Sequence, residues 1–198
     1  GNDQVFNASL LGAKTLSYAY RYTKDDELAE MARLAIKAAV HAQNKDGSWI
    51  YGLHPVQTWI DSFHTGYNLE AIDLYRQATD DSSFEQQVEL GLSYYLNHFF
   101  EEDGRPKYYH NKVYPIDIHC PSQLPVTLSR MNRFHEQEEL VEKVLQWTIN
   151  NMQDPTGYFY YQLKPGSNTK IPYMRGSNAY MMYAMSYYKM EKSQFRDA

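Results

Sequence analysis

Two aspartates, each followed closely by a histidine, are the residues of this chain best suited to acid/base chemistry. They occur as Asp61-Ser-Phe-His64 and Asp117-Ile-His119, and the two aspartates lie 56 residues apart. Two carboxylates with imidazoles around one pocket can act as general acid and general base when their surroundings separate their pKa values. The alternative is structural, because aspartate is a favoured helix N-cap and histidine often forms only a structural hydrogen bond.

A second group of candidates lies in Ile171-Pro-Tyr173-Met-Arg175-Gly176. Arg175 could pair with a substrate carboxylate through two hydrogen bonds, and Tyr173 could serve as acid or base. A uronic acid carries such a carboxylate, which its lyases and epimerases must neutralise before the C5 proton leaves. The alternative is an arginine that ties a loop to acidic neighbours. Asn68 and Glu70, in the first turns after His64, could face the same site.

Aromatic side chains accompany these candidates in three long segments, 45–63, 102–118 and 154–175. Rings with an apolar face and a polar rim suit sugars, which present C–H patches beside hydroxyls. The predicted saccharide contacts are Trp49, Tyr51, Trp59 and Tyr109, together with Asn68, Glu70 and Arg175. The alternative is that these rings fasten the long loops to the ends of helices.

A repeat of 56 residues indicates which elements position these segments. Apolar residues at helical spacing run from Leu28 to Ala39, recur from Phe84 to Tyr95, and return with two polar substitutions from Leu140 to Asn151. Each such stretch follows another helix-like stretch, and a last helix is expected at about Ser177 to Lys192. The pattern predicts an all-α fold of three and a half helical hairpins.

The short turns of these hairpins carry helix-start signals. Thr23 with Asp26, and Ser82 with Glu85, have the spacing of a capping box. The third turn, 133–136, has no such cap, although nearby glutamates would favour a helix N-terminus through its dipole. In this plan the short turns fall at one end of the hairpins and the long aromatic segments at the other.

Each hairpin has an apolar face that it cannot bury alone, so neighbouring hairpins must stack into a solenoid or a closed ring. A ring of six hairpins needs about twice this length at this period. We therefore expect residues 1–198 to form a single domain that is the C-terminal part of a longer protein. Its first helix would lack a neighbour, which predicts an exposed apolar patch or a homodimer through that edge.

Composition excludes several function classes. The net charge of −5 and the lack of any basic run longer than two residues argue against nucleic acid as a partner. No apolar stretch approaches the length of a membrane span, and one cysteine excludes a disulfide framework. No phosphate-binding glycine motif or metal motif occurs, so we expect no cofactor and no metal. Gly1 resembles a residue left after tag removal, and a cytoplasmic location is favoured over others.

One motif resembles a known repeat. Gln43-Asn-Lys-Asp-Gly47-Ser-Trp49 is similar to the Q-x-x-x-G-x-W half of the repeat motif of squalene and terpenoid cyclases, and Gln153-Asp-Pro-Thr-Gly157-Tyr-Phe159 is a looser copy. In that superfamily, which includes the protein prenyltransferases, the motif ties hairpins together in an α/α toroid. The resemblance implies this architecture. The acidic D-x-D-D motif of the cyclases and the zinc ligands of the prenyltransferases are missing, which disfavours isoprenoid chemistry.

Longer strings resemble a narrower group. The segments 59–70, 114–119 and 171–175 are similar to a bacterial α/α-toroid family associated with surface polysaccharides, although Gly176 stands where that family has Trp. A looser likeness extends to six-hairpin glycosidases, uronate lyases and glucuronyl C5-epimerases. This implies a hydrolase, lyase or epimerase acting on an acidic saccharide, with Asp61, His64, Asp117, His119 and Tyr173 as catalytic groups.

The alternative is a non-catalytic helical-repeat module that binds glycan or protein. An enzyme predicts that Asp61, His64 and Asp117 meet in one cavity with side chains free of capping bonds. A binding module predicts that both aspartates are spent on backbone amides.

Overall fold

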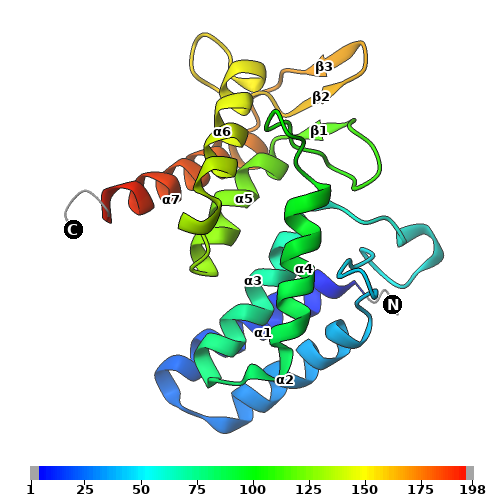
Figure 1. The fold of residues 1–198 in the computed structure, drawn as a ribbon, viewed down its shortest axis with the longest axis vertical. Helices are drawn as coiled ribbons and strands as arrows, with labels where there is room; N and C mark the ends of the chain where they lie inside the picture. Colours follow the sequence, from blue (N-terminus) through cyan, green and yellow to red (C-terminus); the bar gives the residue numbers. More distant parts are fainter. Residues whose placement is uncertain (1–4, 195–198) are drawn as a thin grey trace. The chain divides into compact units, whose positions relative to one another are not determined.

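The computed structural model describes residues 5–194, which form seven α-helices and one small sheet (Figure 1). The helices are α1 (Phe6–Thr23), α2 (Asp26–His41), α3 (Ser62–Thr79), α4 (Glu85–His98), α5 (His119–Arg130), α6 (Glu138–Met152) and α7 (Tyr180–Gln194). Short 3₁₀ helices span Pro55–Gln57, Ser82–Phe84 and His135–Gln137, and a π-helix spans Met174–Ala179. The predicted all-α class and the number of hairpins are confirmed.

The chain divides into two compact units, residues up to Asn97 and residues from His98 onward. In unit 1, α1 packs against both α2 and α3. Helix α3 is buried on almost every side, with 12 of its 18 residues buried. The long loop between α2 and α3 lies at the opposite end of this unit from the two short turns, as the repeat predicts (Figure 1).

In unit 2, α5 packs against both α6 and α7. Ten of the 12 residues of α5 are buried, among them Cys120, the only cysteine of the chain. The antiparallel sheet consists of β1 (Ile116–Asp117), β2 (Gln162–Lys164) and β3 (Ser167–Thr169) in this order. Its register pairs Asp117 with Gln162, so two of the long loops meet at the start of α5.

The predicted capping boxes at Thr23 and Ser82 are wrong. The N-cap of α2 is Asp25, whose carboxylate accepts from the Glu27 amide at 3.0 Å, and Asp81 caps the next turn in the same way. The preceding helices run on to Lys24 and Asp80, which adopt left-handed conformations at φ 55° and 57°. The helix start therefore shifts to the following aspartate, and a carboxylate also complements the helix dipole. The third turn has no side-chain cap, as expected.

The Gln-to-Trp motif fastens a loop to a helix, as the resemblance implies. Trp49 is 2% exposed, and its indole N–H donates to the Ala39 carbonyl at 2.9 Å. Its ring lies directly on Gly91 of α4, where an added Cβ would come within 2.6 Å of it. Gln43 Nε2 donates both to Gly47 and to the Gln87 carbonyl of α4, each at 2.9 Å.

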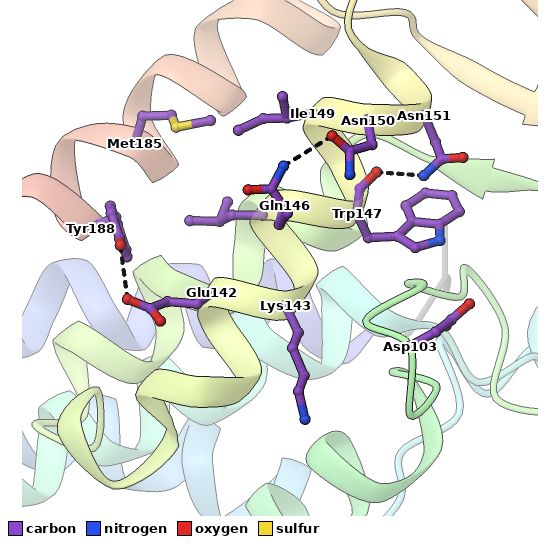
Figure 2. A pocket seen from close by; sticks show the side chains of 11 residues that line it. Asp103, Glu142, Lys143, Gln146, Trp147, Ile149, Asn150, Asn151, Met185 and Tyr188 are labelled. Atoms are coloured by element: carbon purple, nitrogen blue, oxygen red, sulfur yellow. Dashed lines mark hydrogen bonds between the residues drawn. The ribbon is translucent and has the colours of Figure 1, made fainter.

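Apolar side chains remain exposed in both units. On α1 and α2, Leu11, Met31 and Leu34 are 44%, 50% and 57% exposed. In unit 2, a groove of about 570 Å³ runs along α6 and is also lined by Asp103 and by Met185 and Tyr188 of α7 (Figure 2). Among residues 5–194, no helix combines the length and the apolar character needed to cross a membrane.

Candidate functional site

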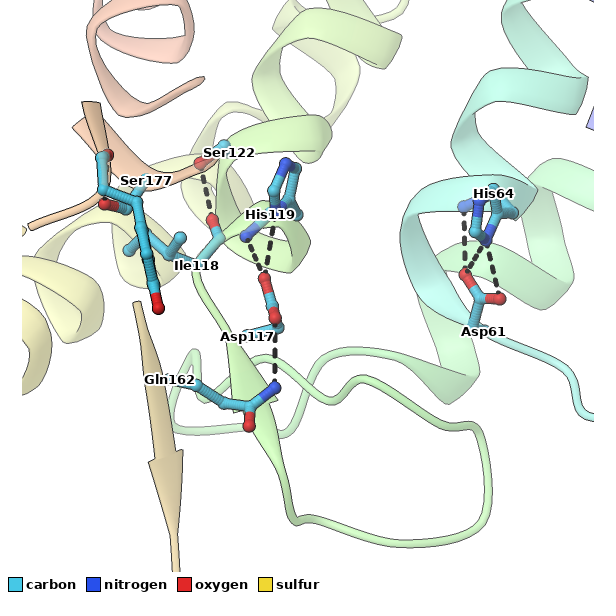
Figure 3. A network of polar contacts seen from close by, with 9 residues as sticks. Asp61, His64, Asp117, Ile118, His119, Ser122, Gln162 and Ser177 are labelled. Carbon is cyan, nitrogen blue, oxygen red and sulfur yellow. Dashed lines mark hydrogen bonds and ion pairs between the residues drawn. The ribbon is translucent and has the colours of Figure 1, made fainter. Parts of the chain in front are cut away.

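In unit 1, the carboxylate of Asp61 organises the start of α3. Its side chain is buried, caps the helix by accepting from the His64 amide at 3.1 Å, and accepts from Trp59 Nε1 at 3.0 Å. The ring of His64 turns back on the same carboxylate, with Nδ1 2.8 Å from Oδ2 (Figure 3). An ionised carboxylate can only accept, so the His64 proton belongs on Nδ1 and Nε2 is left as the basic nitrogen of the neutral ring.

Aromatic rings surround His64. Tyr51 stacks on Trp59 with ring centroids 4.7 Å apart and an interplanar angle of 12°. The centroid of the His64 ring lies 4.7 Å from that of Tyr51 and 4.3 Å from that of Phe63. Two of the predicted saccharide contacts, Tyr51 and Trp59, are thus brought together beside the histidine.

The two polar residues that follow His64 on α3 have different surroundings. Asn68 lies one turn after His64, is 3% exposed, and its Oδ1 has no hydrogen-bond partner among the described residues. Glu70 is equally buried and accepts from Lys14 Nζ of α1 at 2.6 Å. Asn68 therefore remains a candidate for contact with a ligand, whereas the ion pair gives Glu70 a part in holding α1 to α3.

In unit 2, Asp117 repeats this arrangement at the end of β1. One carboxylate oxygen accepts from both the backbone N–H and the Nδ1 of His119, each at 3.0 Å (Figure 3). The other oxygen accepts from Gln162 Nε2 of β2 at 3.1 Å. Both aspartates therefore bind a backbone amide and orient an imidazole, but only Asp61 is a helix N-cap, since the N-cap of α5 is Ile118.

A pocket of about 520 Å³ opens beside His119 and is lined by His119, Tyr161, Tyr173, Met174, Arg175 and Gly176. Tyr173 is 45% exposed, and its ring meets that of Tyr161 edge-on at 5.1 Å. Arg175 is exposed and makes no hydrogen bond or ion pair within residues 5–194. A guanidinium, an oriented imidazole and two phenols thus line one space, as the sequence predicts for three of them.

Tyr161 also lines this pocket, although it is not among the site residues predicted from the sequence. The negative charge of Asp117 raises the pKa of the Tyr161 phenol, and partial burial and a hydrogen bond to the same carboxylate act in the same direction. The Ile118 N–H donates to the Tyr161 carbonyl at 3.1 Å, which holds the tyrosine beside Asp117. The sequence places Tyr161 among the aromatic residues of 154–175 in a strand-like alternation, but it does not reveal the pairing partner of this segment.

Two predicted saccharide contacts lie elsewhere. Trp49 belongs to the core of unit 1, as described above. Tyr109 packs against Tyr108 and under Lys112 Nζ, 4.3 Å from the ring centre, and it is not among the residues lining the pocket. Within residues 5–194, no three His, Cys, Asp or Glu side chains gather closely enough to hold a metal ion.

Comparison with solved structures identifies the fold. The chain is similar to an unsaturated glucuronyl hydrolase specific for heparin, at a TM-score of 0.73 and 13% identity over 96% of this chain and 60% of the other. It is similar to a cellobiose 2-epimerase from Bacillus thermoamylovorans, at 0.70 and 11% over 97% and 60%. A polysaccharide lyase matches at 0.70 and 11% over 100% and 64%.

The chain thus spans about three-fifths of the length of these solved structures. Comparison with protein-family models and with curated proteins gave no match. The predicted architecture is confirmed, and the chain has the α/α-toroid fold that these carbohydrate-active enzymes share.

Proposed function

We propose that this chain belongs to a carbohydrate-active toroid enzyme that acts on an acidic, uronate-containing glycan by acid/base chemistry. The observation that carries the proposal is the pocket of unit 2, where His119, Tyr161, Tyr173 and Arg175 face one space. Solved proteins of the same fold include a glucuronyl hydrolase and a polysaccharide lyase, which makes a saccharide the natural ligand class.

Arg175 is the group that selects a saccharide with a carboxylate. Its guanidinium has no carboxylate partner within residues 5–194 and opens onto the pocket. Arginine binds a carboxylate through two parallel hydrogen bonds. A uronate carboxylate held in this way would be neutralised, which acidifies the C–H bond next to it.

His119 and Tyr161 are the groups that move protons. The contact of Nδ1 with Asp117 leaves His119 Nε2 as the basic nitrogen. The raised pKa of Tyr161 keeps its phenol protonated at neutral pH, so it can donate. Asp117, which is buried and holds several donors, acts as a positioning residue for both. Tyr173 is the second phenol within this space, and Asp61 with His64 forms an equivalent pair in unit 1.

The test is a panel of glucuronate-, galacturonate- and mannuronate-containing glycans with three readouts. Absorbance of a new double bond reports a lyase, new reducing ends without it report a hydrolase, and deuterium uptake at C5 from heavy water reports an epimerase. We expect His119→Gln to lower turnover by about 10²–10⁴-fold with little effect on binding. Arg175→Ala should weaken binding of the acidic glycan by at least about tenfold and leave a neutral glycan unaffected.

A non-catalytic saccharide-binding module is the second candidate. It is favoured by the backbone amide bonds that both Asp61 and Asp117 accept, because these are what helix caps make. It predicts that Arg175→Ala weakens binding as above, while no glycan of the panel is altered and His119→Gln changes nothing. If Arg175→Ala and His119→Gln both bind the acidic glycan as tightly as the wild type, both candidates are excluded for this pocket.

A further inference from the structure

Acidic residues are absent from most of the segments that surround the sheet of unit 2. Between Asp103 and Glu136 the only carboxylate side chain is that of Asp117, and the sequence from Pro155 to Met190 contains none. The chain as a whole has 24 acidic and 19 basic residues. Because β1, β2 and β3 all lie in these two stretches, the sheet and its loops form a basic region on a protein whose net charge is −5.

Four basic side chains of this region have no carboxylate partner within residues 5–194. Lys112 lies in the loop before β1, Lys164 ends β2, Lys170 follows β3, and Arg175 lies in the π-helix. All four residues are exposed. They contrast with Lys107 of the same loop as Lys112, which pairs with Glu101 at 3.2 Å. We call these four side chains the basic strip.

Strand pairing brings Lys112 and Lys164 to the same end of the sheet. Ile116 of β1 pairs with Leu163 of β2, and the two strands are antiparallel. The chain before Ile116 and the chain after Leu163 therefore leave the sheet at the same end. Lys112 lies in the first of these segments and Lys164 begins the second, and Figure 1 shows the loop before β1 and the turn between β2 and β3 extending to the same side.

Lys164 also shares a face of the sheet with Asp117. Residues directly opposite each other on paired strands project to the same face, and so do residues two apart on one strand. Asp117 is paired with Gln162, and Lys164 is the second residue after Gln162. The Lys164 side chain therefore begins about 7 Å along the strand from this pair, on the face of the carboxylate that orients His119.

Two of the lysines are held by aromatic rings. Lys112 Nζ lies 4.3 Å from the centre of the Tyr109 ring, and Lys170 Nζ lies 4.9 Å from the centre of the Tyr160 ring. A ring attracts an ammonium group but carries no net charge, so the positive charge remains available to an anion. The ring of Tyr114, 40% exposed in the loop before β1, adds an apolar surface of the kind that suits a sugar.

The strip is continuous with the pocket of unit 2. Tyr161 lines this pocket, and its backbone N–H donates to the Thr169 carbonyl at 3.1 Å. Because Lys170 directly follows Thr169, its backbone lies beside the pocket wall. Arg175 lines the pocket itself. The pocket and the strip can therefore contact different acidic groups of one ligand chain.

We propose that the basic strip binds carboxylates on successive sugars of one acidic glycan chain, of which the pocket beside Arg175 holds one. The substrate class is then an acidic oligosaccharide or polysaccharide and not a single uronate residue. Arg175 is the cation that the pocket and the strip share. This inference rests on the proposed function, which supplies the identity of the ligand as an acidic glycan.

Charge complementarity favours a glycan over a nucleic acid as the occupant of the strip. A nucleic acid carries a phosphate on every nucleotide and is bound by broad basic surfaces. This chain offers four cations on a protein that is otherwise acidic and repels a polyanion elsewhere. An acidic glycan matches the strip, because its spaced carboxylates suit the lysines and its C–H faces suit the tyrosines.

The test compares a short and a long ligand of the same sugar. Disaccharides and octasaccharides of glucuronate-, galacturonate- and mannuronate-containing glycans are titrated into the chain by isothermal calorimetry at about 50 and 200 mM salt. We expect the matching octasaccharide to bind at least about tenfold more tightly than its disaccharide, because the strip adds contacts within one ligand. The affinity of the octasaccharide should also fall more steeply with salt, because it neutralises more cations.

Two double variants separate the strip from the general charge of the protein. Lys164→Gln with Lys170→Gln should remove most of the advantage of the octasaccharide and leave the disaccharide affinity unchanged, since the pocket is intact. Lys143→Gln with Lys189→Gln removes the same charge from exposed positions of α6 and α7 and should change neither affinity. Arg175→Ala should weaken both ligands.

The proposal is overturned if the octasaccharide binds no more tightly than the disaccharide, or if the two double variants weaken it equally. It is also overturned if single-stranded DNA of equal charge binds as tightly as the octasaccharide, because the strip then recognises any polyanion. A failure of the proposed function alone looks different. The disaccharide then does not bind and Arg175→Ala has no effect, while the octasaccharide still binds and depends on Lys164 and Lys170. Absence of binding by every octasaccharide overturns both.

Discussion

The carboxylate of Asp117 binds three donors that come from two segments of the chain. It accepts from the amide and the ring of His119 and from Gln162, and its charge raises the pKa of the Tyr161 phenol. Removing its charge while keeping its shape therefore alters the histidine and the tyrosine together, which separates a positioning carboxylate from a simple helix cap.

Asp117→Asn should lower the pKa of Tyr161 toward the ordinary tyrosine value of 10.0, because the charge of Asp117 is the largest cause of the raised value. In the wild type, the raised pKa means that the neutral phenol adds stability below pH 10, and this contribution is lost as pH rises through the folded-state pKa. Carbon NMR of Cζ-labelled tyrosine measures the shift, with Tyr161→Phe to assign the signal. An unchanged Tyr161 titration in the Asn variant would contradict the arrangement.

Residue types and spacing were sufficient to find the two Asp–His pairs and Arg175, because each pair lies within one helical turn of sequence. They were insufficient for Tyr161, which reaches Asp117 only through pairing of β1 with β2, 45 residues apart at Gln162. Trp49 shows the opposite error. An aromatic residue in a long loop suits a sugar, but its indole N–H is bound to a helix carbonyl in the core.

Elements are joined in this fold by glycines whose missing side chain leaves room for a neighbour. Gly91 in α4 lies under Trp49, where a Cβ would come within 2.6 Å of the ring, whereas Gly12 in α1 has nothing within 4 Å. The two glycines thus form a matched pair of helical positions.

Gly12→Ala should stabilise the chain by up to about 1 kcal/mol through helix propensity alone. Gly91→Ala should destabilise it by about 1–2 kcal/mol, because the overlap with a buried ring outweighs the same propensity gain. Thermal denaturation measures both, at about 2–4 °C per kcal/mol for a chain of this size. Adding Trp49→Phe should lessen the cost of Gly91→Ala; equal stabilisation by both alanines would show that Trp49 does not rest on α4.

The start of α6 and the end of α7 are held together by charges. Lys192 donates to both Glu138 and Glu142, and these hydrogen bonds are the largest cause of the lowered pKa values of the two carboxyls. Lowered carboxyl pKa values contribute stability above the unfolded value of 4.5, and this is lost as pH falls through the folded values.

Lys192→Met should therefore reduce the loss of thermal stability of the chain between pH 6 and pH 3 relative to wild type. Lys143→Met is the matched control, because Lys143 pairs with Glu139 only along the exposed face of the same helix. Differential scanning calorimetry at several pH values measures the slopes. Equal slopes in wild type and the Lys192 variant would show that this cluster does not clamp α7 to α6.

The spacing of apolar residues predicts which segments form helices, but it does not predict the residue at which each helix begins. Asp25 caps two residues after the expected Thr23, and Asp81 caps one residue before the expected Ser82, because each aspartate directly follows a left-handed residue, Lys24 or Asp80, that ends the preceding helix. The π-helix before α7 has no signal in side-chain periodicity either.

Over the whole molecule, the first helices of successive hairpins differ in enclosure. Helices α3 and α5 bury 12 and ten residues, whereas α7 is largely open on one side. The 56-residue repeat predicted the stacking of hairpins, and the solved toroids confirm it. The repeat alone did not show that, within residues 5–194, no atom lies against Gly157 in the turn 153–157.

Hydrogen exchange should rank these helices accordingly. Amides of α7 are expected to exchange at least about tenfold faster than those of α5, because opening α7 exposes little additional apolar surface. Mass spectrometry of peptides from 119–130 and 180–194 measures both in one sample. Equal protection of the two helices would mean that α7 is covered in solution.

Cys120 lies in the first turn of α5, where its thiol can report chemically on the opening of this helix. It is the only thiol of the chain and is fully shielded inside unit 2. A thiol reagent can therefore react only when that helix opens, and the reaction rate counts such openings. Labelling with and without an acidic glycan would then measure, next to His119, how strongly a ligand holds this half of the protein closed.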